Sequence, residues 1–288
     1  MPLDHYIPQV HLKKFCSPAL GNRMYAIRKT DLKAFTANSS AVCRIINGST
    51  NAYLRKNRAI EEFLKTIEPN YNTALDKLFV GKIDNKCIYT IAGFVAYVIS
   101  CSPTGMRVHS GPLKSIVETE TAMIEAQGLL PPPPARLGGA SLTQLLREGA
   151  VEVRIDPKYP QAIGIDSILK HAAIFGNFKW EILHNDFDES PFFTSDFPAA
   201  IEKTDNPRIL NRIIPLAHNL ALRIRPDPSF DRDRLDLSFA NFGCHSRNIG
   251  QKELEKLNCL IVRCAEETVF YRDDRPGTMG MNYGDVDS

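Results

Sequence analysis

Residues 178–183, Phe-Lys-Trp-Glu-Ile-Leu, mark the point where the pattern of this chain changes from helical to extended. Apolar and polar side chains alternate there, which is typical of a strand with one buried face. The same character continues in residues 192–194, 199–202 and 220–224. We therefore expect the C-terminal part of the chain to form a sheet.

The sequence before this point has helical periodicity. Ile60, Phe63, Leu64 and Ile67 follow the i, i+3, i+4, i+7 spacing, which predicts a helix over 58–80. Pro69 lacks a backbone N–H, so it should break or kink that helix. Further helices are expected after Pro8 and at 85–101, 113–127, 141–148, 164–174 and 250–265, and further strands at 24–29 and 268–271.

Helices that precede strands, without regular alternation, indicate an α+β fold. We expect a helix-rich N-terminal two-thirds and a mostly antiparallel sheet formed by the C-terminal strands. Residues 1–275 are predicted to form a single domain. The four prolines and two glycines within 129–140 indicate a surface loop or a sub-boundary there, and residues 276–288 are expected to be a frayed tail.

Charge is unevenly distributed along the 288 residues, although the net charge is only +2. Residues 1–60 hold ten Lys or Arg and two Asp, which gives +8, so the remainder must carry −6. Such a basic segment could attract nucleic acid or another phosphate-rich ligand. Equally, the two parts could pack together and neutralise each other.

Cysteine usage and the N-terminus bear on localisation. The seven cysteines are odd in number and show no CxxC spacing, which favours a reducing compartment over a disulfide framework. The N-terminus has no apolar run behind a basic start. The most apolar stretch, 87–102, is shorter than the ~20 residues that cross a bilayer. We expect a cytoplasmic protein without membrane partners.

The first candidate site block is His5-Tyr6-Ile7-Pro8-Gln9-Val10-His11-Leu12-Lys13-Lys14-Phe15. Pro8 suits the first position of a helix, whose N-terminus can attract a phosphate or carboxylate. His5 could act as a general acid or base, while Gln9 and Lys13 could bind an anion. Alternatively, these side chains satisfy backbone groups at the start of a helix.

The second block is Phe192-Phe193-Thr194-Ser195-Asp196-Phe197-Pro198. A predicted strand ends there in Ser195 and Asp196. A carboxylate at a strand end could orient His5 or hold a metal ion. Ser and Asp before a proline also form turns by bonding to their own backbone, and the two interpretations stay open.

Several familiar sites are absent from the sequence. Cys244, His245, Cys259 and Cys264 lack the repeated short spacing of zinc ligands, so we expect no metal site. There is no GxSxG, no P-loop and no GxGxxG motif. The cofactor, if any, is unknown from the sequence.

The two blocks together resemble a broad family of bacterial and fungal proteins that is known only as a domain of unknown function. The resemblance rests on the His-Tyr-x-Pro-Gln block, on Trp180, on the Thr-Ser-Asp-x-Pro block and on Ile214-Pro215-Leu216. Family members carry an Arg before a small residue and Pro, whereas this chain has Ser100-Cys101-Ser102-Pro103, with Arg107 the nearest arginine. The resemblance implies no established activity.

Three functional hypotheses follow. In the first, the protein is a hydrolase or nuclease acting on a phosphate-containing substrate. His5, Gln9, Lys13 and Asp196 would then be catalytic, and Ser195, Arg28, Lys29 and Arg107 would bind substrate. In the second, it is a non-catalytic module that binds nucleic acid or a protein. In the third, the motif residues only hold the fold together.

Overall fold

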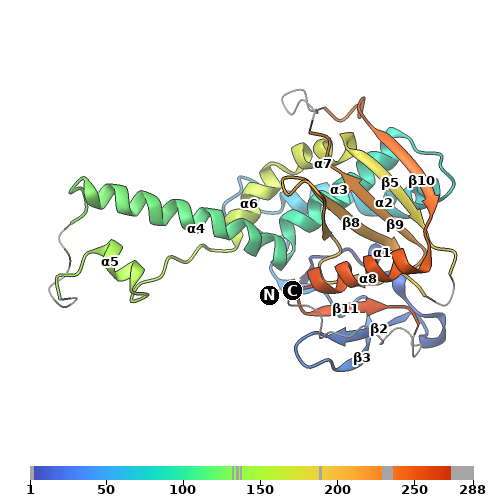
Figure 1. Cartoon of the computed structure of the whole chain (residues 1–288), viewed down its shortest axis with the longest axis horizontal. Coiled ribbons are helices and arrows are strands. Elements are labelled where there is room, and N and C mark those ends of the chain that lie inside the picture. The colour runs from blue at the N-terminus through green and yellow to red at the C-terminus, as the bar shows by residue number, and fades with distance from the viewer. Residues whose placement is uncertain are drawn as a thin grey trace.

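A five-stranded sheet in the order β10-β5-β9-β8-β7, which we call the central sheet, lies in the body of the molecule (Figure 1). The computed structural model describes residues 3–131, 133, 136, 138–187, 190–228 and 236–273. The strands of this sheet are β5 (Lys179–His184), β7 (Ala200–Lys203), β8 (Leu210–Ala217), β9 (Leu220–Arg225) and β10 (Gly243–Asn248).

A second, smaller sheet joins the two ends of the described chain. Its order is β3-β2-β11-β6, so the C-terminal strand pairs with an N-terminal one. Its members are β2 (Arg23–Arg28), β3 (Ala34–Asn38), β6 (Thr194–Ser195) and β11 (Thr268–Tyr271), and a separate pair is formed by β1 (Leu3–His5) and β4 (Arg44–Ile46).

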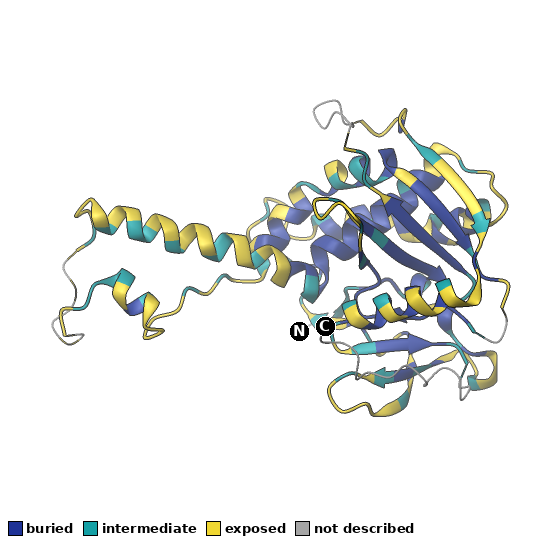
Figure 2. Cartoon of the chain, viewed as in Figure 1, coloured by how far each residue is buried: buried dark blue, intermediate teal, exposed yellow. Residues whose placement is uncertain are grey.

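The helix α3 (Asn85–Cys101) forms the core of the helical layer, as its continuous apolar sequence predicts. It is buried along almost its whole length and packs against α2 (Ala59–Phe79) and α7 (Ile168–Asn177) (Figure 2). Asp84 caps its first turn by accepting a hydrogen bond from Cys87 N at 2.9 Å. The remaining helical elements are α1 (Gln9–Leu12), η1 (Lys13–Phe15), η2 (Pro18–Leu20), α4 (Pro103–Ala126), α5 (Leu142–Arg147), α6 (Lys158–Asp166) and α8 (Gln251–Cys264).

The two faces of the central sheet differ in chemistry. Trp180 lies on the face toward the helical layer, and its indole N–H donates to Phe175 O of α7 at 2.7 Å. The opposite face carries Glu181 and Arg223, which are buried and form an ion pair at 2.6 Å. Glu253 of α8 joins this network through Arg223 at 3.2 Å, so α8 is held to the sheet by charge as well as by apolar packing.

The helix α4 projects from the body as an arm, with α5 returning beside it (Figure 1). Glu125 fixes α5 by accepting bonds from Ser141 Oγ, Leu142 N and Thr143 N at 2.8–3.2 Å. Of the expected loop at 129–140, Pro132, Pro134, Ala135 and Leu137 lie outside the described residues, as does the expected tail at 276–288.

The α+β class is confirmed, but the expectation that the sheet is formed by C-terminal strands is wrong. The strands are not confined to the C-terminal part, because residues before 47 contribute β1 to β4. The central sheet is mixed, because β10 runs parallel to β5 while its other strand pairs are antiparallel. The parallel pair joins segments far apart in the sequence, which local periodicity does not reveal.

Pro69 does not break the predicted helix. The helix α2 continues from Ala59 to Phe79 with Pro69 inside it. Ile67 and Tyr71 are fully buried on either side of the proline, and their packing offsets the lost backbone hydrogen bond. Asn70 Nδ2 also donates to Thr66 O at 2.9 Å across the same turn.

No helix of the described ranges is by itself both long and apolar enough to cross a bilayer, although α3 and α4 pass that test together as a pair bent by 61°. The seven cysteines are free thiols.

Candidate functional site

The two sequence blocks meet in the core through His11 and Thr194. His11 Nε2 lies 3.0 Å from Thr194 Oγ1, and its Nδ1 lies 2.8 Å from the hydroxyl of Tyr71 on α2. The ring also stacks on Phe94 of α3, with centroids 4.8 Å apart. Complete burial lowers the pKa of His11 to about 3, so the ring is neutral at physiological pH.

His11 was not among the residues selected from the sequence. Nothing in the spacing of the block separates it from His5, because both are single histidines near a short helix. The difference is burial: His11 is fully enclosed, while His5 is half-buried. His11 therefore acts as a polar connection inside the core.

Asp196 lies in this second block and holds the start of β11. Its Oδ1 accepts from Glu266 N at 2.8 Å, and its Oδ2 accepts from Glu267 N at 2.8 Å and Thr268 N at 2.9 Å. Burial raises the pKa of Asp196, and these three N–H donors oppose that rise. Both carboxylate oxygens are thus engaged with backbone.

Ser195 is fully buried, and its Oγ accepts from Phe197 N at 3.1 Å. This is the local turn that the second interpretation of the block anticipated. The catalytic role of Asp196 and the substrate-binding role of Ser195 stay predictions, and the observed contacts favour a structural role for both.

His5 lies at the edge of the small β1–β4 pair. Its carbonyl oxygen accepts from the Tyr97 hydroxyl at 2.8 Å. Burial, followed by the nearby charge of Arg44, lowers the pKa of the His5 side chain. No hydrogen bond joins His5 to Asp196 in the described part of the chain, and Gln9 begins α1 at a half-buried position.

The three predicted substrate-binding cations have partners within the protein. Arg28 pairs with Asp31 at 3.2 Å, and Arg107 pairs with Glu266. Lys29 Nζ donates to Ala265 O at 2.6 Å and to Arg263 O at 3.2 Å. Lys29 therefore completes the C-terminus of α8, where a cation also interacts favourably with the helix dipole.

Lys13, the remaining catalytic candidate, lines a cleft of about 460 Å³. The short helix η1 presents Lys13 and Lys14 at the surface because Phe15, which follows them, is anchored in the core. The end of α2, the turn between β8 and β9 and the segment after β11 supply the rest of the lining. The cleft is lined by Lys13, Lys14, Cys16, Leu75, Asp76, Phe79, Ala217, His218, Asn219, Leu220 and Arg272, and we call it the basic cleft.

His218 connects the walls of the basic cleft. Its Nδ1 lies 3.3 Å from Lys14 O, and its Nε2 contacts Arg272 Nη1. A carbonyl oxygen can only accept, so Nδ1 carries the proton in this arrangement. Nε2 then accepts from Arg272, which is the bonding pattern of a neutral imidazole.

The basic cleft holds more positive than negative charge. It contains two lysines and one arginine but only one carboxylate, Asp76. Within the described ranges neither Lys13 nor Lys14 forms an ion pair, and the Nε of Arg272 is buried without a hydrogen-bond partner. An unsatisfied buried donor beside two unpaired ammonium groups is suited to an anion that accepts several hydrogen bonds.

Among the described residues, no group of three or more His, Cys, Asp or Glu side chains could hold a metal ion. The N–H and ammonium donors that line the basic cleft match the acceptor oxygens of phosphate and carboxylate groups.

A family model described as a protein of unknown function (DUF4238) matches residues 4–275, so the chain belongs to this family. The match spans both sequence blocks, in agreement with the resemblance that they carry. No curated protein and no solved structure matches the chain. Any function must therefore be inferred from its own residues.

Proposed function

We propose that this member of the DUF4238 family binds a phosphate-bearing ligand in the basic cleft. The observation that carries the proposal is the buried Nε of Arg272, which has no hydrogen-bond partner among the described residues, in the same cleft as Lys13 and Lys14, which form no ion pair with any of them. Each unsatisfied buried donor costs about 1–3 kcal/mol until it finds an acceptor. A phosphate would supply that acceptor and neutralise the cluster.

The three cations have different roles in this site. Arginine offers a planar set of N–H donors that matches phosphate oxygens, and the buried Nε–H of Arg272 has no acceptor among the described residues. Lys13 and Lys14 add charge on flexible stems from the opposite wall. Binding strength should therefore depend most on Arg272 and should fall as salt screens the two lysines.

A compact ligand is favoured over a nucleic-acid strand. A strand needs a row of free cations along its backbone. Arg28, Lys29 and Arg107 are all engaged with groups of the protein itself. Lys13 and Lys14, which form no ion pair among the described residues, instead line a cleft of limited volume, about 460 Å³.

Hydrolysis of a phosphate ester is a second candidate, favoured by the position of His218. If a phosphate draws the Arg272 guanidinium toward itself, Nε2 of His218 can accept a proton. Water would then attack phosphorus as the P–O ester bond breaks, with the water proton passing to Nε2 and on to the departing alkoxide. His218 would be the catalytic base, in place of the His5 expected from the sequence.

The experiment that tests binding is calorimetric titration with inorganic pyrophosphate at low and at 0.3 M salt, a concentration of roughly twice physiological ionic strength. We expect the Arg272→Gln variant and the Lys13→Ala/Lys14→Ala double variant each to weaken binding about tenfold or more. Lys33→Ala, at an exposed lysine outside the cleft, is the matched control. Equal affinity of Arg272→Gln and the parent protein would refute the site.

Hydrolysis is tested separately with p-nitrophenyl phosphate. His218→Gln should abolish turnover while pyrophosphate still binds, because the variant retains the three cations. Turnover that survives in His218→Gln would exclude His218 as the base, and turnover lost only in His5→Ala would restore the original assignment.

A further inference from the structure

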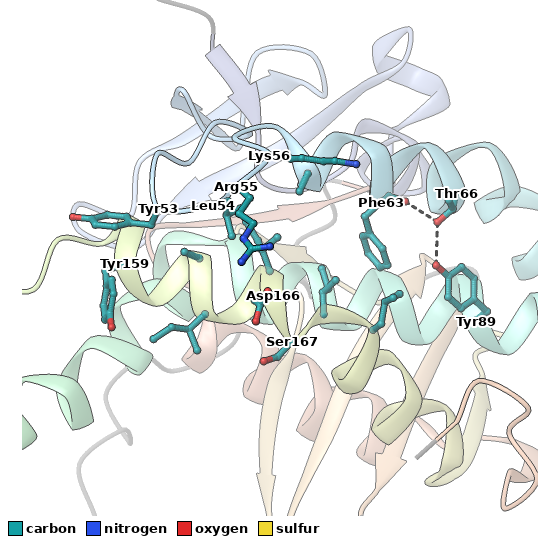
Figure 3. A pocket seen from close by; sticks show the side chains of 16 residues that line it. Tyr53, Leu54, Arg55, Lys56, Phe63, Thr66, Tyr89, Tyr159, Asp166 and Ser167 are labelled. Atoms are coloured by element: carbon teal, nitrogen blue, oxygen red, sulfur yellow. Dashed lines mark hydrogen bonds between the residues drawn. The ribbon is translucent and has the colours of Figure 1, made fainter. Parts of the chain in front are cut away.

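A second concave site lies on another part of the molecule, between the segment 53–56 and the helices α6 and α7 (Figure 3). It has a volume of about 890 Å³ and shares no lining residue with the basic cleft. Pockets that hold small molecules have volumes of about 300–1,000 Å³. We call this site the apolar groove.

The floor of the apolar groove is hydrophobic. Phe63 of α2, Ile165 of α6 and Ile168 of α7 are buried at its base. Four further apolar or aromatic side chains line its sides and remain largely exposed to solvent, at 46–53% of their surface. They are Tyr53, Tyr159, Ile163 and Leu169. Their convergence makes one exposed apolar patch, which is the kind of surface that marks a binding site.

The shape of the apolar groove is set by hydrogen bonds within the protein. Asn51 Nδ2 donates to Lys158 O at 2.7 Å and to Gln161 Oε1 at 3.1 Å, which ties the segment before Tyr53 to α6. The hydroxyl of Tyr53 donates to Asp156 at 2.9 Å, and its ring packs edge-on against Tyr159 with centroids 5.4 Å apart. The groove is therefore formed before any ligand arrives.

The charges around the apolar groove lie on opposite sides. Arg55 extends from one wall toward Asp166 at the end of α6, with Lys56 beside it (Figure 3). None of these three side chains forms an ion pair with any described residue. The rim thus has two cations against one carboxylate, with an apolar floor below them.

We propose that the apolar groove binds a small amphipathic anion, with its acidic group on Arg55 and Lys56 and its apolar body over Phe63, Ile165 and Ile168. The two cations of the rim would attract the acidic group of the ligand, and the hydrophobic floor would contact its apolar body. A neutral hydrophobic molecule would gain no electrostatic attraction from the two cations, and a purely polar anion would leave the floor exposed to water. This site does not depend on the basic cleft.

The proposal is tested by titrating the whole protein with anilinonaphthalene sulfonate, an aromatic anion whose fluorescence rises in an apolar site. We expect binding to weaken about tenfold or more in Arg55→Glu/Lys56→Glu and in Leu169→Glu. These side chains are exposed, so the variants should fold. The controls are Lys33→Glu for charge and Ile116→Glu for an exposed apolar side chain on α4, 57% exposed.

Competition then identifies the ligand class. Decanoate should displace the dye, and decanol, of equal chain length but without charge, should need a concentration about tenfold higher or more. The proposal is overturned by absent dye binding, by unchanged binding in either groove variant, or by equal displacement by decanol. Loss of dye binding in Ile116→Glu alone would place the dye on the α4 arm and would also overturn it.

Discussion

His11 and Thr194 lie 183 positions apart in the sequence and are joined in the core by a contact of 3.0 Å between Nε2 and Oγ1. With the second ring nitrogen bonded to Tyr71, the imidazole connects the N-terminal block, the helical layer and the strand β6. The two sequence blocks are therefore linked by a neutral histidine that is closed to solvent, and not by a reactive one at the surface.

This contact predicts a pH-dependent stability. The pKa of His11 is about 3 in the folded protein and about 6.5 when unfolded, so the unfolded chain alone binds a proton between these values. The contribution of the neutral His11 to stability is fully present above about pH 6.5. The free energy of unfolding should fall by on the order of 2 kcal/mol between pH 7 and pH 5. In urea unfolding at pH 7 and pH 5, the His11→Gln variant should not show this fall in the free energy of unfolding. A variant with the same pH dependence as the parent protein would contradict the prediction.

Asp196 should be required for stability. In Asp196→Asn, an amide NH₂ replaces one carboxylate oxygen and faces backbone donors instead of accepting from them. We expect a loss of about 3 kcal/mol in the free energy of unfolding, since buried N–H groups lose their acceptor. Thermal denaturation measures it, with Asp205→Asn at an exposed aspartate as the control. If Asp196→Asn kept the stability of the parent protein but lost an activity that the parent protein has, the result would instead support a catalytic role for Asp196.

Removal of one charge from the buried ion network around Arg223 should lower the free energy of unfolding strongly. Burial raises the pKa of Glu181, but hydrogen bonds from Arg223 and Arg247 outweigh this and hold it at about 2. Arg223→Met should cost roughly 3–5 kcal/mol because it leaves Glu181 and Glu202 buried without their main partner. Arg225→Met, at a side chain 53% exposed, should cost far less.

The same network is sensitive to acid. Because the folded pKa of Glu181 lies below its ordinary value of 4.5, its contribution is present above that pH and is lost as pH falls toward 2. A double-mutant cycle of Glu181→Gln and Arg223→Met should show strong coupling at pH 7 that declines at low pH. Additive effects at pH 7 would rule the pair out as a coupled unit.

Lys29 should affect stability rather than ligand binding. Lys29→Met removes the donor to Ala265 O and Arg263 O, which leaves the last turn of α8 without its cap. We expect a loss of about 1 kcal/mol in the free energy of unfolding. Pyrophosphate affinity should be unchanged. Reduced affinity with normal stability would return Lys29 to the substrate-binding role expected from the sequence.

Two glycines of α4 should respond very differently to alanine. A Cβ on Gly105 would lie 1.9 Å from Ile99 O, where the chain bends by 61° between α3 and α4. Gly105→Ala should therefore cost more than about 3 kcal/mol. A Cβ on Gly111 would meet no described atom beyond its chain neighbours and its own helix, but Pro112 follows and disfavours a helical residue with a Cβ, so Gly111→Ala should change stability by less than about 1 kcal/mol in either direction. Circular dichroism melts distinguish the two, and equal effects would contradict this account.

Local patterns in the sequence were sufficient for many individual elements. The apolar run at 85–101 predicts α3, and the alternation at 178–183 predicts β5, because burial on all sides or on one face imposes those periods directly. The strand β10 was missed because Cys244, His245 and Ser246 are exposed, so this edge strand carries no apolar alternation. Residues 158–177 form the two helices α6 and α7, whereas the sequence predicted only one shorter helix at 164–174.

By itself, the sequence determined the α+β class, the two blocks and the family resemblance, since each depends on short stretches of contiguous residues. Only the tertiary structure decided which side chains the blocks bring together. It enclosed His11 with Thr194, turned Asp196 toward the backbone of β11, and placed Lys13 beside Arg272 from the other end of the described chain. Burial and partner choice depend on long-range packing, and the reactivity of a side chain follows from both.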